Sequence, residues 1–424
     1  MKNIIVLTRR YYPNMSPISA VIDKYIQRLK FKYNFHVICI AGQSSLVKPD
    51  DPIINVHYIK NKLWIVRLWS EEKYNETGKK LYYYIMQMCR ARAAFLNLLG
   101  DNLAYKWEKN AYYKALVSIS RNTTIDGIIS VSGDTVFTHL AAQKFKIEDP
   151  STIWLSFFTD PYTFQDMMFY PALFDKEKNK RKRYITEKNI YDAADNNIVT
   201  EELYKSVIED FKQPKNKTIC FKYVLDDIRA KIGVIEKPST CGESISLMYA
   251  GAFYRKIRNP RPVLAIMDKV NNIIFDLYVT SRECNDILDK YKSDSIKVYD
   301  GVPASEYKHK ICYEYDILVN VGNDCDFQAP SKMLEYVSTG RPIINFYYRK
   351  DSQYELISHY PLGLNVDIRD VEAYKEIESF CKDMKGKQMP FKDIEELFPD
   401  NNLSKQVNVL ETLIENKYNR YGND

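Results

Sequence analysis

The sequence predicts an α/β protein with two doubly wound domains in tandem and a helix that closes the chain. Two observations lead to this prediction. Short apolar runs alternate with helical stretches along the chain, and this alternation breaks once and then resumes. The chain has 424 residues, which is enough for two to three domains of about 150 residues each.

The strands of the first half are recognised by runs that are apolar throughout rather than alternating with polar residues. Such runs suit parallel strands that are covered by helices on both faces of the sheet. An amphipathic stretch over residues 18–31 separates the first two runs and has helical spacing. The predicted strands of this half are residues 3–8, 35–40, 127–131, 152–157 and 197–200.

A Gly/Pro/Ser-rich stretch at residues 232–246 interrupts the pattern and is predicted to be a linker. A second series of apolar runs begins directly after it, so a second sheet of the same kind is expected. The predicted strands of this half are residues 245–250, 275–279, 296–299, 316–321 and 342–346.

The end of the sequence is predicted to be helical. Leu403, Val407, Leu410 and Ile414 lie at helical spacing and predict a helix over residues 403–418. The predicted domains are residues 1–235, residues 236–400, and a C-terminal helix in residues 401–424 that packs back on the first domain.

Composition and charge exclude several classes of protein. A hydrophobic content of 45% and a charged content of 27% are typical of a soluble globular protein. No apolar run reaches the roughly 18 residues of a membrane span. A net charge of +6, from 61 basic and 55 acidic residues, is too small to indicate nucleic-acid binding. Eight cysteines without a C-x-x-C pair, and no secretory signal, predict reduced thiols in a cytoplasmic protein.

Several phosphate-binding and metal-binding motifs are missing from the sequence. None of the 14 glycines lies two positions from another, so there is no G-x-G fingerprint of a dinucleotide oxidoreductase. The pairs Gly78-Lys79 and Gly386-Lys387 lack the other residues of a P-loop, and H-E-x-x-H does not occur. Two facing α/β domains still predict a ligand in a cleft, at the carboxyl ends of the strands.

The most informative segment is residues 329–344, APSKMLEYVSTGRPII. Pro330 and Ser331 are helix start signals and Gly340 is a stop signal, so a short helix is predicted over residues 331–339. This helix follows the strand at residues 316–321. Its N-terminus is therefore expected to point into the cleft and to attract an anion such as a diphosphate.

Glu335 lies one turn into this predicted helix, on the same face as Ser331. A carboxylate at this place can accept hydrogen bonds from two ribose hydroxyls while the helix N–H groups hold the phosphates. The alternative is that Glu335 is a solvated helix carboxylate without a ligand.

The segment from Pro330 to Ile344 resembles the nucleotide-sugar signature of GT-B glycosyltransferases, specifically glycosyltransferase family 4. Other segments resemble that family in the same order along the chain: Asp160-Pro161-Tyr162, Glu187 to Thr200, Tyr249-Ala250-Gly251, and Gly301-Val302-Pro303-x-x-Glu306. The resemblance implies two tandem Rossmann-like domains, of which the first binds the acceptor and the second binds a nucleotide sugar.

The resemblance also implies the chemistry. The expected enzyme is a hexosyltransferase-type glycosyltransferase that moves a sugar from a UDP- or GDP-sugar to a glycan or polyprenol-linked acceptor in bacterial surface polysaccharide synthesis. The configuration at the anomeric carbon would be retained, and neither a metal nor another cofactor would take part. Two alternatives remain open: a nucleotide-sugar epimerase on the same fold, and an inactive protein that binds sugar nucleotides.

Nucleotide-sugar contacts are implied for Gly251, Val302, Ser331, Lys332 and Glu335. Because no divalent ion would be present, positive side chains must stabilise the departing diphosphate.

The family's arginine next to the opening glycine is replaced here by Ala252, and a basic cluster follows closely. Arginine is a good bidentate phosphate ligand, so Arg258 and Arg255 are expected to act on the diphosphate, with Lys256 as a further contact. The alternative is an ordinary basic loop.

Two further positions depart from the family or need an interpretation. Phe327 stands where the family has a glutamate, so Asp326 or the backbone of residues 325–328 would hold the donor sugar. The Asp324-x-Asp326 pair resembles a metal motif of the other glycosyltransferase fold, but a chance occurrence or a loop-capping role is expected. Asp160 is expected to contact the acceptor hydroxyl or assist catalysis, with a purely structural turn role as the alternative.

Two basic regions suggest a hypothesis of peripheral contact with the inner face of the cell membrane. Residues 79–113 combine lysines and arginines with many aromatic residues, and residues 176–183 hold six basic side chains in eight positions. Such helices can seat a protein on an anionic membrane near a lipid-linked acceptor. The alternative is that these aromatics pack in a core and that the charges form a solvated face.

Overall fold

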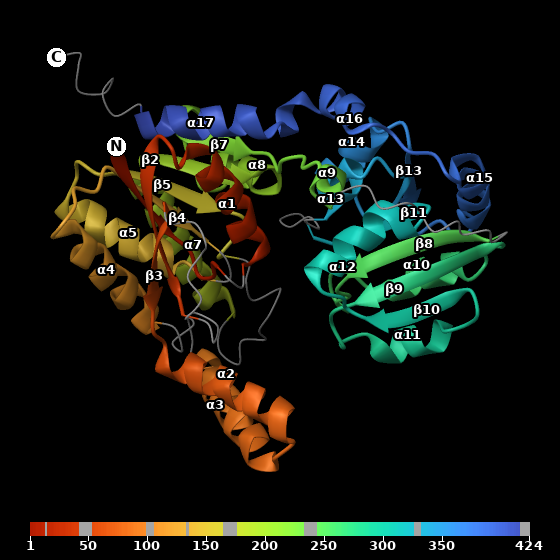
Figure 1. Ribbon diagram of the computed structural model, residues 1–424, viewed down its shortest axis with the longest axis horizontal. Helices are drawn as coiled ribbons and strands as arrows, with labels where there is room; N and C mark the ends of the chain where they lie inside the picture. The colour runs from red at the N-terminus through yellow and green to blue at the C-terminus, as the bar shows by residue number, and fades with distance from the viewer. Residues whose placement is uncertain are drawn as a thin grey trace. The chain divides into compact units, whose positions relative to one another are not determined.

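The computed structural model describes residues 1–12, 15–41, 53–98, 106–132, 135–163, 176–232, 244–325 and 332–415. The chain forms two compact units, each with its own parallel sheet (Figure 1). Unit 1 comprises Met1–Lys222 with Gln406–Asp424, and unit 2 comprises Tyr223–Lys405. The predicted fold class of two doubly wound α/β domains is therefore confirmed. Most of the predicted linker, residues 233–243, lies outside the described residues.

Unit 1 is built on a parallel sheet of seven strands in the order β3-β2-β1-β4-β5-β6-β7. The order reverses between β1 and β4, which is the topological switch point of a doubly wound sheet. β4 and β5 are buried along their whole length, which explains their unbroken apolar runs. The strands are β1 (Lys2–Leu7), β2 (Tyr33–Ile40), β3 (Asn55–Ile59), β4 (Gly127–Val131), β5 (Ile153–Phe158), β6 (Asn196–Thr200) and β7 (Thr218–Phe221).

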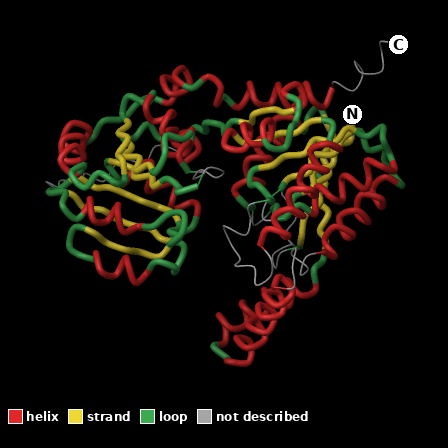
Figure 2. Tube along the Cα trace, turned by 180° about the vertical axis from the view of Figure 1, so that it is seen from behind, coloured by secondary structure: helices red, strands yellow, loops and turns green. Residues whose placement is uncertain are grey.

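Helices cover both faces of this sheet (Figure 2). Phe157 of β5 faces α1 and α17, whereas the next residue, Phe158, stacks on His139 of α5. The helices of this part of the chain are α1 (Pro17–Leu29), α2 (Lys62–Thr77), α3 (Lys80–Leu98), α4 (Lys106–Ser120), α5 (Phe137–Glu148), α7 (Lys176–Ala193), α8 (Glu201–Glu209) and α17 (Leu403–Glu415).

Local sequence explains where α1 begins and how α17 is held. Ser16 caps α1 in a capping box with Ser19, and Pro17 follows at the first helical position. At the other end of the chain, α17 buries Val407, Leu410 and Ile414. Glu415 of α17 accepts a 2.6 Å hydrogen bond from the Tyr33 hydroxyl at the start of β2.

Unit 2 repeats the same topology with six parallel strands in the order β10-β9-β8-β11-β12-β13. The switch point lies between β8 and β11. The strands are β8 (Ile245–Gly251), β9 (Ile273–Val279), β10 (Ile296–Asp300), β11 (Ile317–Val321), β12 (Ile343–Tyr347) and β13 (Gly363–Asp367). The helices are α9 (Ile228–Ile232), α10 (Pro260–Met267), α11 (Asn285–Tyr291), α12 (Ala304–His309), α13 (Met333–Ser338), α14 (Ser352–Ser358), α15 (Tyr374–Met384) and α16 (Phe391–Leu397).

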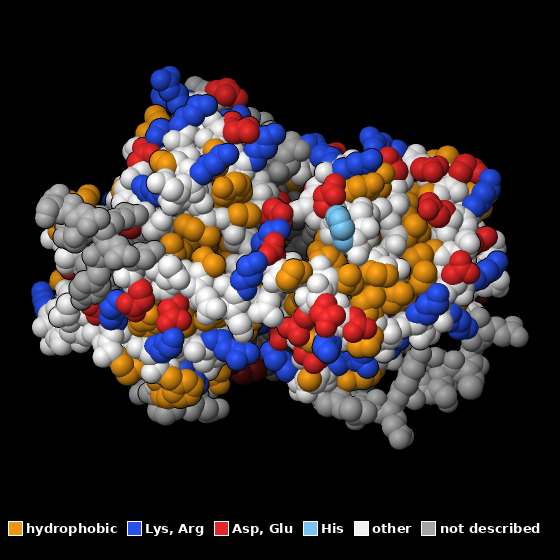
Figure 3. Space-filling view, turned by 90° about the horizontal axis from the view of Figure 1, so that it is seen from above, with side chains coloured by type: hydrophobic (Ala, Val, Ile, Leu, Met, Phe, Trp, Pro, Cys, Tyr) orange, Lys and Arg blue, Asp and Glu red, His pale blue; other side chains and the backbone are white. Residues whose placement is uncertain are grey.

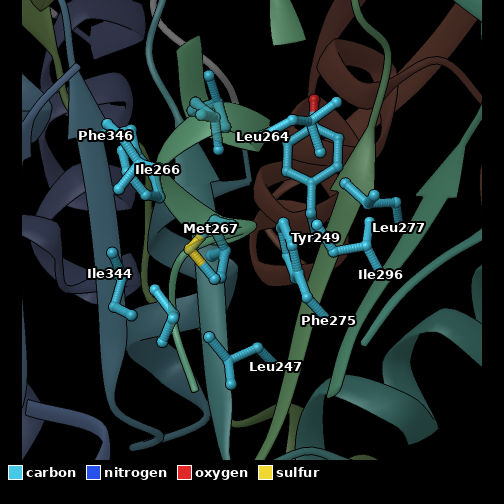
Figure 4. Packing of buried hydrophobic residues seen from close by; sticks show 14 of the residues in the cluster. Leu247, Tyr249, Leu264, Ile266, Met267, Phe275, Leu277, Ile296, Ile344 and Phe346 are labelled. Atoms are coloured by element: carbon cyan, nitrogen blue, oxygen red, sulfur yellow. The ribbon is translucent and has the colours of Figure 1, made fainter. Parts of the chain in front are cut away.

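The core of unit 2 lies on both faces of its sheet. Leu247 and Tyr249 of β8 pack with Phe275, Ile344 and other residues of one cluster, drawn in Figure 4. Met248 and Ala250, which alternate with them along the strand, belong to a second cluster on the opposite face. Because both faces are covered, the successive residues Leu247 to Ala250 are all apolar, which is the pattern that the sequence shows.

Candidate functional site

The candidate site lies in unit 2, where the chain leaves the carboxyl ends of β8 and β11. The loop after β8 folds back on itself through backbone hydrogen bonds between Tyr254 and Arg258, of 3.1 Å and 2.8 Å. The loop after β11 joins it, because the Asp324 amide donates to the Ile257 carbonyl at 2.6 Å. The two loops on either side of the switch point are therefore one hydrogen-bonded structure.

Gly251 is the last residue of β8 and allows close packing there. A Cβ atom at this position would lie 2.8 Å from the Tyr249 hydroxyl, which itself donates to the Ala252 carbonyl at 3.0 Å. The Gly251 carbonyl accepts from the Thr280 amide at 3.0 Å, which ties in the loop after β9. The side chain of a larger residue would displace Tyr249 from the loop that carries the basic cluster.

Arg258 is held at the switch point by two loops. Its Nε donates to Oδ1 of Asn323 at 2.9 Å, and Nη1 donates to the carbonyl of Ala252 at 3.2 Å. Asn323 is buried, so this side chain is a fixed anchor for the half-buried guanidinium. The carbonyl of Ala252, the residue that departs from the family pattern, thus helps to position the arginine further along the loop.

The other two basic residues of the cluster lie elsewhere. Arg255 forms an exposed ion pair with Asp286 of α11, and its backbone N–H donates to Glu283 at 3.0 Å. Lys256 is exposed on the loop. Of the three predicted diphosphate contacts, only Arg258 is held at the switch point by the loop after β11.

The segment predicted as a helix over residues 331–339 forms α13, from Met333 to Ser338, with Lys332 at its N-cap. Ser331, the preceding predicted ligand, lies outside the described residues. With only six helical residues, the summed peptide dipole of α13 is small. Any anion held at this end of α13 would therefore be bound mainly by charged side chains.

Glu335 and Lys332 meet around one aromatic side chain. The Tyr307 hydroxyl, from α12, donates to Oε2 of Glu335 at 3.0 Å. The Lys332 ammonium lies 4.2 Å from the centroid of the Tyr307 ring, within cation–π range. Because Tyr307 is buried, its hydroxyl and its ring hold the Glu335 carboxylate and the Lys332 ammonium in place.

The charges of Arg258, Lys332 and Glu335 act on one another. Burial lowers the pKa of the Lys332 ammonium, Arg258 lowers it further, and Glu335 opposes both effects. Arg258 also lowers the pKa of the buried Tyr336 hydroxyl, although burial raises it overall. Two cations and one carboxylate thus share this edge of the sheet, and an anion that binds between the cations would relieve their repulsion.

Buried contacts fix α13 against the sheet. The Tyr336 hydroxyl accepts from the Ala250 amide at 3.3 Å, directly before Gly251. At the other end of the helix, the Ser338 hydroxyl accepts from the Asp226 amide at 3.1 Å. The positions of Lys332 and Glu335 relative to the end of β8 are therefore set by buried side chains on the same helix.

Val302 lies in the loop after β10 and is partly buried against the second core cluster of unit 2. Gly301, just before it, packs against Thr280, because an added Cβ would lie 2.5 Å from that residue's Cγ2. The loop after β10 therefore packs directly against the loop after β9. It continues into α12, which carries Tyr307.

Asp160, the predicted catalytic residue of the first half, lies in the loop after β5 in unit 1, two residues beyond the end of the strand. It is half-buried and accepts from the Thr159 hydroxyl at 3.2 Å. Three residues later, Thr163 donates from its amide to Glu187 of α7 at 2.8 Å. Burial raises the pKa of Glu187, and the Thr163 hydrogen bonds oppose that rise. The loop with Asp160 is thus anchored on α7, which contains the start of the Glu187 to Thr200 segment quoted above.

Sequence reasoning did not identify Asn323 and Tyr307. A signal for each exists: Asn323 lies two residues beyond the end of β11, and Tyr307 directly follows Glu306 of the quoted G-V-P-x-x-E segment. The Asp324-x-Asp326 pair can be described only in part. Asp324 pairs with Arg349 at 3.4 Å, and Asp326 and Phe327 lie outside the described residues.

No protein-family model matches this sequence, and a search of curated proteins finds no match either. Solved structures do match along the whole chain. The α,α-trehalose 6-phosphate synthase of Burkholderia multivorans superposes with a TM-score of 0.61 at 9% identity, covering 99% of this chain and 100% of that chain. The catalytic domain of starch synthase IV from Arabidopsis thaliana, bound to ADP and acarbose, gives 0.57 at 10% identity, with 99% of each chain covered.

Alr3699/HepE of Anabaena, in complex with UDP and glucose, gives a TM-score of 0.55 at 11% identity, covering 97% of this chain and 99% of that chain. Identities this low establish the fold alone. The chain has the GT-B fold of glycosyltransferases, as the sequence predicted. Membership of glycosyltransferase family 4 stays a prediction.

Proposed function

We propose that this protein is a glycosyltransferase that uses a nucleoside diphosphate sugar as donor. The observation that carries the proposal is the grouping of Arg258, Lys332 and Glu335 at the switch point of unit 2. The GT-B fold of the matching glycosyltransferases supports the same reading. Unit 2 would bind the nucleotide sugar, and unit 1 would bind the acceptor.

The three charged side chains have separate roles in this proposal. Arg258 and Lys332 bind the diphosphate, where their positive charges face oxygens that become more negative as the sugar departs. Glu335 accepts hydrogen bonds from the ribose hydroxyls, with its other oxygen oriented by Tyr307. The loop with Gly301 and Val302 would contact the base. Ser331 completes the set of donor contacts carried over from the family resemblance.

The reaction we propose retains the configuration at the anomeric carbon and uses no metal. A phosphate oxygen of the donor accepts the proton of the acceptor hydroxyl as that oxygen bonds to the sugar. The bond between sugar and diphosphate breaks on the same face. Because the leaving group then carries more charge, the fixed cations stabilise the transition state more than the ground state. Asp160 would contact the acceptor.

By family resemblance, the transferred sugar is a hexose from a UDP- or GDP-sugar. The acceptor we propose is a glycan or a lipid-linked sugar in the synthesis of a bacterial surface polysaccharide, made on the cytoplasmic side of the membrane.

The direct test is to incubate the purified protein with a panel of UDP-, GDP- and ADP-sugars and to analyse the products. Slow release of free sugar and nucleoside diphosphate from one donor is the result expected of a transferase that lacks its acceptor. A new isomer of the nucleotide sugar would instead identify an epimerase. Binding without any turnover, also after glycan and lipid-linked acceptors are added, would identify an inactive binding protein.

A further inference from the structure

The helical hairpin α2–α3 is a separate feature of unit 1. Figure 1 shows it extending away from the sheet of that unit. The two helices are joined at Gly78, whose φ of 65° ends α2 in the left-handed conformation. They pack on each other through aromatic pairs such as Trp69–Tyr82, with ring centroids 5.4 Å apart.

The two sides of α3 differ in exposure. Met86 and Cys89 are buried. On the opposite side, Leu81, Tyr84, Met88 and Phe95 are 65%, 60%, 72% and 60% exposed. Their spacing of three, four and seven residues places them on one stripe along the helix. This stripe, named here the α3 stripe, is a row of large apolar side chains that faces water.

The charges that α3 itself carries are all positive. Helix α3 has no Asp or Glu, and its charged residues are Lys80, Arg90 and Arg92, all exposed. Arg90 faces α2 and pairs with Glu71 at 3.7 Å, whereas Lys80 and Arg92 lie on the side of the helix that carries the stripe. Lys79 in the turn before it is exposed as well. Elsewhere charges are mixed: on the face drawn in Figure 3, Lys and Arg side chains are interspersed with Asp and Glu.

We propose that the α3 stripe docks on an anionic lipid bilayer, with α3 lying along the interface. An apolar row on a helix whose own charges are lysine and arginine is the pattern of helices that bind such surfaces. Within the described ranges, no helix is both long enough and apolar enough to cross a bilayer. The contact would therefore be peripheral, through side chains that enter the headgroup region.

A second copy of the chain is a poorer occupant of the same face. If two α3 stripes packed together, Lys80 and Arg92 of both copies would come close with no carboxylate on either α3 helix to pair with them. An anionic membrane neutralises these charges and covers the apolar row at the same time. This proposal does not rest on the proposed enzyme activity, although it would bring the chain to a surface that holds lipid-linked acceptors.

The experiment is flotation of the full-length protein with vesicles of phosphatidylglycerol and phosphatidylcholine in equal parts. Binding is expected, and high salt should weaken it because the charges are screened. The double variant Met88→Glu, Phe95→Glu should bind at least about tenfold more weakly, since two apolar anchors are lost and the charge changes sign. The matched control is Ile147→Glu, which adds a carboxylate at an apolar side chain of α5 that is 74% exposed.

A second variant pair tests the charges separately. Lys80→Gln with Arg92→Gln should weaken binding to the anionic vesicles and leave the weaker binding to pure phosphatidylcholine unchanged. No binding of the wild type to anionic vesicles, or equal loss in Ile147→Glu, would overturn the proposal. A wild-type dimer that Met88→Glu dissociates would assign the α3 stripe to self-association instead. None of these measurements needs a nucleotide sugar, so they stand whether or not the protein transfers one.

Discussion

Arg258 and Asn323 are joined by a 2.9 Å hydrogen bond from Nε to Oδ1 across the switch point of unit 2. Asn323 is buried and Arg258 is half-buried, so the bond holds a cation at a defined place beside the end of β8. Arg255, three residues earlier, uses its guanidinium in an exposed pair with Asp286. The two arginines therefore offer a matched comparison.

Arg258→Gln is expected to weaken the binding of nucleoside diphosphates by about 10- to 100-fold, because it removes a charge-assisted contact to the diphosphate. Arg255→Gln should change the affinity by less than about threefold, since it removes only an exposed ion pair. Isothermal titration with UDP, GDP and ADP measures both effects. A larger loss in Arg255→Gln than in Arg258→Gln would contradict the assignment.

Glu335→Ala should abolish a preference for ribose hydroxyls. The wild type is expected to bind the preferred nucleoside diphosphate about tenfold more tightly than its 2′,3′-dideoxy form, because the carboxylate of Glu335 accepts from those hydroxyls. In the variant the two ligands should bind equally. Tyr307→Phe keeps the carboxylate and removes only its 3.0 Å hydrogen bond, so the preference should fall by about threefold. A variant Glu335→Ala that still discriminates would show that the ribose lies elsewhere.

The central strands of both sheets were predictable from sequence, and most of the edge strands were not. β1 and β8 have neighbouring strands on both sides and helices on both faces, so their buried runs, residues 4–7 and 247–250, are all apolar. The predictions missed β3, β7 and β13, and each of these lies at the edge of its sheet. An edge strand is less covered, and the polar β3, Asn55–Ile59, shows how little apolar signal such a strand needs.

The candidate site could be predicted in part. The motif identified Lys332 and Glu335 because their spacing along the chain is itself the signal. The choice between Arg255 and Arg258 depended on the backbone turn that pairs Tyr254 with Arg258. That turn is stabilised by residues of a distant loop, Asn323 and Asp324, which no local pattern reveals.

Gly340 ends α13 with a φ of +71°, and a Cβ there would lie 2.0 Å from the Met389 carbonyl oxygen. Gly340→Ala is expected to destabilise unit 2 by roughly 3 kcal/mol or more, because it combines left-handed strain with a clash against backbone. Gly386→Ala is the control, since Gly386 has a φ of +75° and no atom within 4 Å of an added Cβ. Gly386→Ala should lower the free energy of unfolding by only about 1 kcal/mol. Denaturant unfolding followed by circular dichroism measures both, and equal losses would refute the role of the Met389 contact.

His139 gives unit 1 a predictable sensitivity to acid. Its ring is fully buried, stacks on Phe158 with centroids 4.1 Å apart, and has Nδ1 2.7 Å from the Ser130 hydroxyl. Within the described residues, Nε2 has no hydrogen-bond partner. Burial lowers the pKa of His139 from 6.5 to about 3 in the folded chain. Protonation therefore favours the unfolded state, so the stability is complete above pH 6.5 and is lost as the pH falls toward 3.

From this group alone, the wild type should lose about 2 kcal/mol between pH 6.5 and pH 5, at 1.4 kcal/mol per pH unit. His139→Gln should be less stable near neutral pH, because the ring stacking is lost, but its stability should fall by about 2 kcal/mol less over the same interval. All four tryptophans lie in residues 1–222, so denaturant unfolding followed by tryptophan fluorescence reports on unit 1. Parallel curves for wild type and His139→Gln would mean that His139 does not titrate as its burial requires.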